Sequence, residues 1–195
     1  MILTPTVADI LRPSEKSQAS LYNVTLILSG SLFIALSAQI SIGGPIPFTM
    51  QTFAVLLIGA LFGAKFGCLS VALYLLEGLA GLPVFSYWRS GWVMFAGPTG
   101  GYLVGFLAAA YVTAFLAQRG WDRRFFTTFL AMLAGNVIIY TFGILHLSNL
   151  IGVRLALIEG LYPFIAGAVI KISLAAALLP TGWKCLEYCG FLKKR

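Results

Sequence analysis

The sequence predicts an all-α membrane protein with six transmembrane helices and both termini in the cytoplasm. Three observations lead to this fold class: the composition, the lengths of the apolar runs and the distribution of basic residues. Hydrophobic residues make up 59% of the 195-residue chain and charged residues only 10%, whereas a soluble domain carries about 25% charged residues. Because so few charges cannot cover a water-facing surface, we expect lipid to be the main solvent of this chain.

The second observation is a series of apolar runs that approach the roughly 20 residues a spanning helix needs. Two of them are short and are separated only by Gly63-Ala-Lys65, which predicts a tilted or tightly turned pair. The six runs cover residues 22–42, 49–63, 66–82, 98–118, 125–147 and 157–179. The predicted organisation is a cytoplasmic N-terminal segment (1–21), a six-helix transmembrane substrate-binding domain (22–180) and a basic cytoplasmic tail (181–195).

The third observation is the distribution of Lys and Arg between the runs, which predicts the orientation. With an inside N-terminus, ten basic residues lie on the inside and two, Arg89 and Arg154, on the outside. The inside residues are Arg12, Lys16, Lys65, Arg119, Arg123, Arg124, Lys184, Lys193, Lys194 and Arg195. This bias follows the positive-inside rule. The net charge of +7 therefore indicates topology and contact with lipid headgroups, and we expect no nucleic-acid partner.

This orientation places the segments rich in Gly and Pro outside. They are the turn at residues 43–47 and the loops 83–97 and 148–156. Irregular backbone near membrane depth persists only where it is buried or lines a cavity. We therefore expect a pocket that opens to the outside.

Lys171 lies within the last apolar run, where a lysine costs roughly 2.5–3.5 kcal/mol on insertion scales. Pro163, Gly167 and Lys171 are spaced by four residues, which predicts one helical stripe that forms a wall of a polar pocket. The alternative is a lysine that extends its ammonium group to the inner interface near Pro180.

Two further charged residues are candidates for binding. Glu77 is an acid inside a run, so it could pair with Lys171 or share a ligand with it; alternatively it is hydrated near the outer end of its helix. Arg89 lies among aromatic residues outside and suits a carboxylate, although an interfacial aromatic belt explains it as well.

Two glycine- or small-residue patterns have a functional and a purely structural interpretation. The segment Gly97-Pro-Thr-Gly-Gly-Tyr102 opens the fourth run, and amides at a helix N-terminus favour polar or anionic ligands; close helix packing is the alternative. Ser31 and Ala35 form a small-xxx-small pair that could dock a partner helix or serve internal packing.

No pattern in the sequence favours an enzyme. The chain has no Walker A motif, no GxSG element and no CxxC pair, so ATP hydrolysis, intramembrane proteolysis and a thiolate metal site are not expected. We expect neither a cofactor nor a metal ion.

Five segments, in order along the chain, together resemble the BioY family, the biotin-binding S components of energy-coupling-factor (ECF) vitamin transporters. They are Ala35-Leu-Ser-Ala-Gln-Ile-Ser41, Pro45-Ile-Pro-Phe-Thr-Met-Gln-Thr-Phe-Ala-Val-Leu-Leu57, Gly78-Leu-Ala-Gly-Leu-Pro-Val-Phe85, Gly97-Pro-Thr-Gly-Gly-Tyr-Leu103 and Pro163-Phe-Ile-Ala-Gly167 with Lys171. The resemblance covers about residues 30–180 and therefore nearly the whole predicted membrane domain.

The resemblance implies capture of biotin from outside a bacterial cytoplasmic membrane. It also implies delivery through a coupling subunit with two ATPases, or function as a homo-oligomer. By resemblance, Lys171 meets the ureido head of biotin, Arg89 or a neighbour meets the carboxylate, and the loop 83–97 acts as a lid. Gln51, Gly167 and Tyr102 belong to the same implied site. The small residues Ser31 and Ala35 would face the coupling subunit.

One departure from the family pattern concerns the ureido ring. The family motif Gly-Asp-x-x-Lys is here Gly167-Ala-Val-Ile-Lys171, so the acid is replaced by Ala168. The ureido N–H groups then need another acceptor, and Glu77 or Gln51 is the candidate. The alternative functions are an ion-coupled carrier for another small carboxylate or vitamin, an intramembrane enzyme, and a scaffold that transports nothing.

Overall fold

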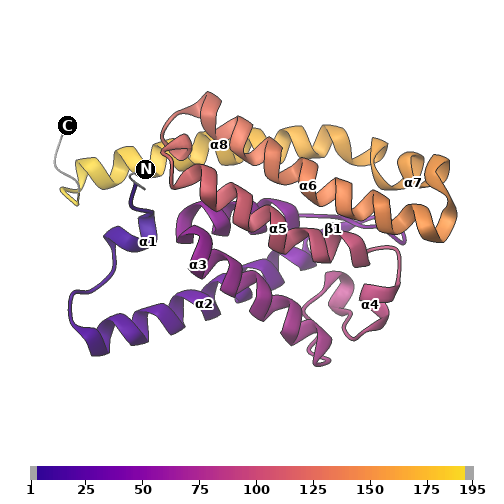
Figure 1. Cartoon of the computed structure of the whole chain (residues 1–195), viewed down its shortest axis with the longest axis horizontal. Coiled ribbons are helices and arrows are strands. Elements are labelled where there is room, and N and C mark those ends of the chain that lie inside the picture. The colour runs from indigo at the N-terminus through magenta and orange to yellow at the C-terminus, as the bar shows by residue number, and fades with distance from the viewer. Residues whose placement is uncertain (1–3, 192–195) are drawn as a thin grey trace.

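The computed structural model describes residues 4–191 as a bundle of long helices with short connecting elements (Figure 1). The long helices are α2 (Lys16–Gln39), α3 (Gln51–Leu79), α5 (Gly100–Ala117), α6 (Phe125–Ile151) and α8 (Ile165–Tyr188). The short elements are α1 (Val7–Ile10), β1 (Ser41–Ile42), β2 (Phe48–Thr49), η1 (Ser86–Trp88), α4 (Val93–Ala96), η2 (Trp121–Arg123), α7 (Val153–Gly160) and η3 (Tyr162–Phe164).

The bundle is built around α3 and α5. Helix α3 packs against α2 and α5, α5 packs against α6, and α6 packs against α8. Figure 1 shows α6 and α8 side by side on one side of the bundle and α2 on the opposite side. Small residues allow the closest approach: a Cβ atom on Gly59 would lie 2.7 Å from the Ala110 carbonyl oxygen of α5.

Helix α3 covers most of both short predicted runs, 49–63 and 66–82, and its backbone is broken at Gly63. Gly63 has a non-helical backbone, with φ 76° and ψ 176°, a conformation that glycine adopts without the cost other residues incur. A Cβ atom on Gly67 would lie 3.0 Å from the Gly59 Cα, although residues eight apart in a straight helix are separated by about 12 Å. The chain therefore turns back sharply at Gly63, as the sequence predicts for this pair of runs.

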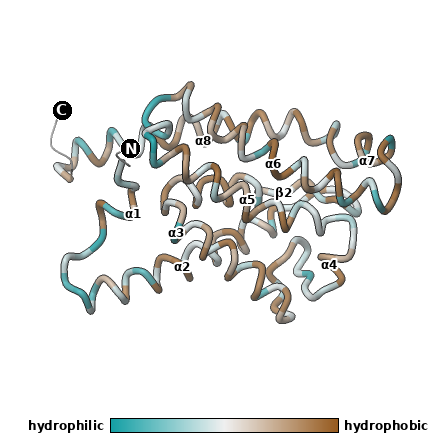
Figure 2. The backbone as a smooth tube through the Cα atoms, in the orientation of Figure 1, coloured by the Kyte–Doolittle hydropathy of each residue, from teal (hydrophilic) through white to brown (hydrophobic). Residues whose placement is uncertain are grey.

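The structure confirms a helical membrane protein. Within residues 4–191, five helical stretches are long and apolar enough to cross a membrane, and the last of them combines α7, η3 and α8. The count is lower than the six predicted runs because both halves of α3 belong to one stretch. Figure 2 shows hydrophobic residues along all the long helices, with hydrophilic residues gathered in the α1–α2 and α5–α6 connections.

The end of the chain differs from the prediction in two respects. The predicted outer loop 148–156 is mostly helical, since α6 ends at Ile151, Gly152 makes the turn and α7 follows. The predicted run 157–179 is interrupted by η3, so Pro163 precedes α8 and does not share a helical stripe with Gly167 and Lys171. The interruption occurs where the Gly160 carbonyl accepts a 2.8 Å hydrogen bond from the Tyr102 hydroxyl.

The ends of the long helices also extend beyond the predicted runs. Helix α2 begins at Lys16, and α8 continues past Pro180 to Tyr188. The basic residues Lys193, Lys194 and Arg195 of the predicted tail lie outside the described residues.

A small hairpin connects α2 to α3. Strands β1 and β2 are antiparallel, with Ser41 opposite Thr49 and Ile42 opposite Phe48. The Gly-Pro-rich turn of residues 43–47, which the sequence predicts, closes the hairpin. The strands themselves were not predicted, because the apolar run 22–42 extends through both residues of β1. The hairpin brings Phe48 and Thr49 to the first turn of α3, where the candidate site begins.

Candidate functional site

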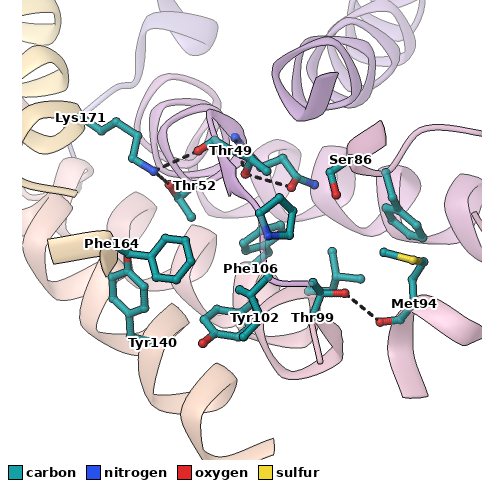
Figure 3. Close-up of a pocket in the computed structure, with 15 residues that line it drawn as sticks. Thr49, Thr52, Ser86, Met94, Thr99, Tyr102, Phe106, Tyr140, Phe164 and Lys171 are labelled. Atoms are coloured by element: carbon teal, nitrogen blue, oxygen red, sulfur yellow. Dashed lines mark hydrogen bonds between the residues drawn. The ribbon is translucent and has the colours of Figure 1, made fainter. Parts of the chain in front are cut away.

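A cavity lies between the hairpin, the start of α3, the segment 85–99 and helices α5, α6 and α8 (Figure 3). Its walls are mostly aromatic and aliphatic, with several hydroxyl, amide and ammonium groups among them. The lining residues are Ile46, Pro47, Thr49, Gln51, Thr52, Phe85, Ser86, Met94, Thr99, Tyr102, Leu103, Phe106, Tyr140, Phe164 and Lys171. An apolar cavity with a few convergent polar groups is typical of a small-molecule site.

Lys171 contributes the ammonium group on one side of this cavity. Its Nζ donates to the Thr49 carbonyl at 3.0 Å and to Thr52 Oγ1 at 2.7 Å, and it lies 4.4 Å from the centroid of the Phe48 ring. The side chain is only 5% exposed. Lys171 therefore faces the interior, and the alternative of a lysine reaching the inner interface does not apply in this structure.

Gln51 forms the next polar group along the wall. Its side-chain oxygen accepts a 3.0 Å hydrogen bond from Thr49 Oγ1, and its amide nitrogen donates to the Tyr74 hydroxyl. Gln51 is the first residue of α3 and is 6% exposed. This network orients the Gln51 amide at the cavity wall.

Aromatic side chains close the cavity on the side of α5 and α6. Tyr102 is held by its hydrogen bond to the Gly160 carbonyl, and its ring packs edge to face on Tyr140 with centroids 6.3 Å apart. Tyr140 in turn lies 6.5 Å from Phe164, and Phe164 stacks on Phe48 at 6.4 Å. These rings form a continuous apolar wall from α5 to the hairpin, suited to a ligand with an apolar body.

The segment 84–88 covers the cavity from the side of α2. Gln39 Nε2 donates to the Phe85 carbonyl at 3.1 Å, and Gln39 Oε1 accepts from the Trp88 backbone N–H at 3.1 Å. Tyr87 and Trp88 both have positive φ angles, 59° and 58°, a region that costs non-glycine residues energy and persists only where surrounding contacts enforce it. The Gln39 side chain at the end of α2 therefore helps to hold a strained covering segment in place, together with the hydrogen bonds from the Tyr74 hydroxyl to the Val84 carbonyl and from the Tyr87 hydroxyl to the Gly43 carbonyl.

Arg89 does not line the cavity in this structure. Its side chain is exposed, and its guanidinium lies over the Tyr87 ring, 5.4 Å from the centroid. Its backbone carbonyl accepts a 3.0 Å hydrogen bond from the Phe85 N–H. Arg89 thus directly follows the covering segment and is joined to it by this hydrogen bond, with its side chain exposed.

Glu77 also lies apart from the cavity lining. Its carboxylate accepts a hydrogen bond from Ser31 Oγ, which joins the end of α3 to α2. No Asp or Glu occurs among the lining residues that the structure describes. The two candidates for replacing the acid missing at Ala168 are therefore separated by the fold: Gln51 is at the cavity and Glu77 is not.

The docking prediction for Ser31 and Ala35 needs correction. Ser31 is 1% exposed and Ala35 is 9% exposed, because this face of α2 packs against α3. Next to them, a Cβ atom on Gly30 would lie 2.5 Å from Ser70 Oγ of α3. The small residues serve internal packing, which was the alternative interpretation of the pattern.

Gly167 and the residues missed by sequence reasoning complete the site. A Cβ atom on Gly167 would lie 2.0 Å from the Phe48 ring, so the absence of a side chain at Gly167 leaves room for this ring beside Lys171.

The sequence-based prediction did not include the lining residues Thr49, Thr52, Ser86, Thr99, Tyr140 and Phe164. Most of these lie in or beside the segments of family resemblance, which could have indicated them, whereas no sequence signal distinguishes Tyr140.

Comparison with known proteins places this arrangement among membrane transport proteins. The model described as "BioY family" matches residues 13–188. A biotin transporter BioY of Thermotoga maritima is 40% identical over 167 residues, covering 83% of this chain and 96% of the relative. A probable biotin transporter BioY of Pyrococcus horikoshii is 37% identical, covering 76% of this chain and 90% of the relative.

A solved structure has the same fold. It is the S component for biotin from an ECF-type ABC transporter, and it superimposes with a TM-score of 0.77 at 27% identity. The match covers 88% of this chain and 95% of that one. The similarity therefore extends over nearly the whole helical bundle.

Proposed function

The chain belongs to the BioY family, and we propose that it takes up biotin across the cytoplasmic membrane of a bacterium as the substrate-binding S component of an ECF-type transporter. The observation that carries this proposal is the cavity that contains Lys171. Biotin combines an apolar bicyclic ring and alkyl chain with a ureido group at one end and a carboxylate at the other. The aromatic wall suits the ring and chain, and the polar groups of Lys171, Gln51 and Ser86 suit the ends.

The proposed contacts with biotin follow from which of the candidate residues line the cavity. Lys171, Gln51 and Tyr102 contact biotin directly, since all three line the cavity. Gly167 acts through the Phe48 ring that it accommodates. Glu77 and Arg89 act indirectly. Glu77 fixes α3 to α2 through Ser31, and Arg89 is joined by its carbonyl to the covering segment, which opens to admit the ligand.

The proposed topology has six crossing segments, with the two halves of α3 counted separately on either side of Gly63. Both termini lie in the cytoplasm in this proposal, which the excess of Lys and Arg in the connections on that side supports. The cavity with its hairpin and covering segment 84–88 then opens to the outside. The membrane domain of residues 22–180 and the flanking cytoplasmic segments follow the same assignment.

The proposed partners are suggested by the similarity to the S component of an ECF-type ABC transporter. A transmembrane coupling subunit and two ATPase subunits supply the energy, or the chain works as a homo-oligomer. The lipid-facing surface of α2, which includes Leu28, Leu32 and Leu36 with 51–59% exposure, remains available for such an assembly because the opposite face is packed on α3.

Uptake of labelled biotin tests the proposal. The chain is expressed in a bacterial strain without its own biotin uptake, alone and together with a coupling subunit and ATPases. We expect accumulation of biotin that depends on the chain and is competed by unlabelled biotin. Accumulation abolished by a proton uncoupler while ATP is maintained would indicate an ion-coupled carrier instead, and no accumulation with any partner set would contradict the proposal.

A further inference from the structure

Tyr74 lies behind the wall of the cavity without lining it. It belongs to the second half of α3, its side chain is 0% exposed, and it is not among the described lining residues. A tyrosine hydroxyl is costly to bury inside a helical bundle unless it has hydrogen-bond partners. The partners of this hydroxyl therefore indicate what it does at this position.

The Tyr74 hydroxyl connects the cavity wall to the covering segment. It accepts a hydrogen bond from the side-chain amide of Gln51, and it donates to the Val84 carbonyl at 3.3 Å. The Tyr74 ring packs edge to face on Phe85, with centroids 5.5 Å apart, and Phe85 itself lines the cavity. One side chain of α3 thus contacts both a polar group of the cavity wall and the first two residues of the covering segment.

The two bonds of this hydroxyl are the middle of a longer chain of hydrogen bonds across the bundle. On the cavity side, Lys171 Nζ donates to the Thr49 carbonyl, and Thr49 Oγ1 donates to the Gln51 side-chain oxygen. On the other side, Gln39 Nε2 also donates to the Val84 carbonyl, at 3.4 Å. Because the hydrogen bonds of a chain polarise one another, a change at Gln51 alters the bond that holds Val84.

A ligand in the cavity acts on this chain at Gln51, which lines the cavity. An amide side chain has two N–H donors and a carbonyl oxygen with two lone pairs. Thr49 occupies one lone pair and Tyr74 accepts from one N–H, so one of each remains. A ligand group that bonds to either fixes the orientation of the amide. The Tyr74 hydroxyl is then already ordered when it binds the Val84 carbonyl, which lowers the entropic cost of closing the covering segment.

We propose that Tyr74 is a positioning residue that couples ligand binding at Gln51 to closure of the covering segment. This inference rests on the proposed function, since the ligand is biotin in the same cavity, and it holds for either end of biotin at Gln51. The coupling is reciprocal: the ligand favours the closed segment, and the closed segment retains the ligand.

The test compares the same substitution at two tyrosines in the purified full chain. Tyr74→Phe keeps the ring beside Phe85 and removes only the hydroxyl. Tyr22→Phe is the matched control, because the Tyr22 hydroxyl also makes a bond between elements, to the Ala8 carbonyl at 2.9 Å. That bond lies at the α1 end of the bundle, opposite β1 and α4 (Figure 1).

The first measurement is the rate of biotin dissociation, followed by stopped-flow fluorescence. We expect Tyr74→Phe to release biotin about three- to tenfold faster than the wild type, as for the loss of one hydrogen bond. The association rate should stay within about twofold of the wild-type value, because the residues that line the cavity are unchanged. Tyr22→Phe should match the wild type in both rates.

Amide hydrogen exchange supplies a measurement that a merely structural role would not change. Biotin should slow the exchange of residues 84–88 in the wild type, and this slowing should be several-fold smaller in Tyr74→Phe. A tyrosine that only stabilises the fold would alter exchange with and without biotin equally. Tyr22→Phe should show the full wild-type slowing.

Gln51→Leu tests the path without any ligand. Within the described chain no hydrogen bond joins Gln51 to residues 84–88, so an effect of Gln51 on their exchange passes through Tyr74. We expect faster exchange of residues 84–88 in Gln51→Leu than in the wild type. The same substitution should add no further increase in the Tyr74→Phe background, as for two residues that act through one bond.

The outcomes separate the inference from the function. Full biotin-induced slowing of exchange in Tyr74→Phe, or an equal loss of slowing in Tyr22→Phe, would overturn the coupling while leaving biotin binding intact. An effect of Gln51→Leu that is undiminished in the Tyr74→Phe background would overturn the path through Tyr74. Failure of the wild-type chain to bind biotin would instead contradict the proposed function.

Discussion

Lys171 of α8 and Thr52 in the first turn of α3 share a 2.7 Å hydrogen bond, although 119 residues separate them in the chain. This bond and the one to the Thr49 carbonyl connect the last helix to the hairpin and to α3. The residue that provides the charge of the cavity thus also ties together the elements that form its walls. Changes in these contacts should alter both stability and binding.

Removing the Thr52 hydroxyl tests this connection. In Thr52→Val a methyl group replaces the hydroxyl. One N–H of the buried Lys171 ammonium group therefore loses its acceptor. We expect the free energy of unfolding to fall by about 1–3 kcal/mol, measured by denaturation in detergent. Thr52→Ser keeps the hydroxyl and is the matched control. Equal stability of Thr52→Val and Thr52→Ser would show that the hydrogen bond contributes little.

Glycine positions on α8 offer a matched pair for testing the packing of Phe48. In Gly167→Ala the added Cβ would lie 2.0 Å from the Phe48 ring, so the ring must move away from Lys171 and Phe164. We expect a loss of about 1–3 kcal/mol from overpacking and weaker biotin binding. Gly182→Ala on the same helix meets no atom within 4 Å and should be neutral or slightly stabilising. Similar binding by the two variants would contradict the role given to Gly167.

The fold of the membrane domain follows largely from hydropathy and turn residues. Runs of apolar residues predict the long helices, and Gly63 predicts the reversal within α3 because few other residues adopt its backbone conformation. The interruption before α8 was not predictable from hydropathy. It depends on the contact between Tyr102 and the Gly160 carbonyl, which exists only after α5 and α7 have packed.

The candidate site was predictable from the sequence only in part. A lysine in an apolar run is costly, so Lys171 could be recognised from the sequence. A small-residue pattern on α2 is equally suited to internal and external packing, so it could not show that Ser31 faces Glu77. Ordinary residues such as Thr52 and Tyr140 acquire a place in the cavity only through the tertiary fold.

The covering segment should respond to changes at Gln39. Gln39→Leu removes the hydrogen bonds to the Phe85 carbonyl and the Trp88 N–H, which support the positive φ angles of Tyr87 and Trp88. We expect faster amide hydrogen exchange in residues 84–88 and faster dissociation of biotin, since the segment opens more often.

The matched control for this change is Gln18→Leu, an exposed position on the same helix. It should leave both the exchange rates of residues 84–88 and the dissociation rate at wild-type values. If Gln39→Leu behaves like this control, the Gln39 side chain does not hold the covering segment closed.

Asp122, in the connection between α5 and α6, predicts a pH dependence of stability. Burial raises the pKa of its carboxyl to about 6, although a hydrogen bond from Trp183 and the nearby Arg123 act in the opposite direction. Trp183 Nε1 donates to Asp122 Oδ2 at 2.6 Å. The folded state therefore holds the Asp122 proton to a higher pH than the unfolded state does.

The sign of the effect follows from this difference in proton binding. The free energy of unfolding should fall as the pH rises from about 4 to about 6, by roughly 3 kcal/mol at a little over 1.3 kcal/mol per unit of pKa. Denaturation of the wild type and of Asp122→Asn at several pH values measures it. The variant, which keeps an acceptor for Trp183, should lack this decline; an identical pH profile would rule out Asp122 as the titrating group.

An equilibrium titration of the purified wild-type chain with biotin, followed by calorimetry or intrinsic fluorescence, tests whether the cavity at Lys171 binds biotin. We expect saturable binding at one site per chain, lost or strongly weakened in Lys171→Met and unchanged in Arg154→Gln. Absence of saturable binding by the wild type, or equal affinity in Lys171→Met, would contradict the claim that the cavity at Lys171 is the biotin site.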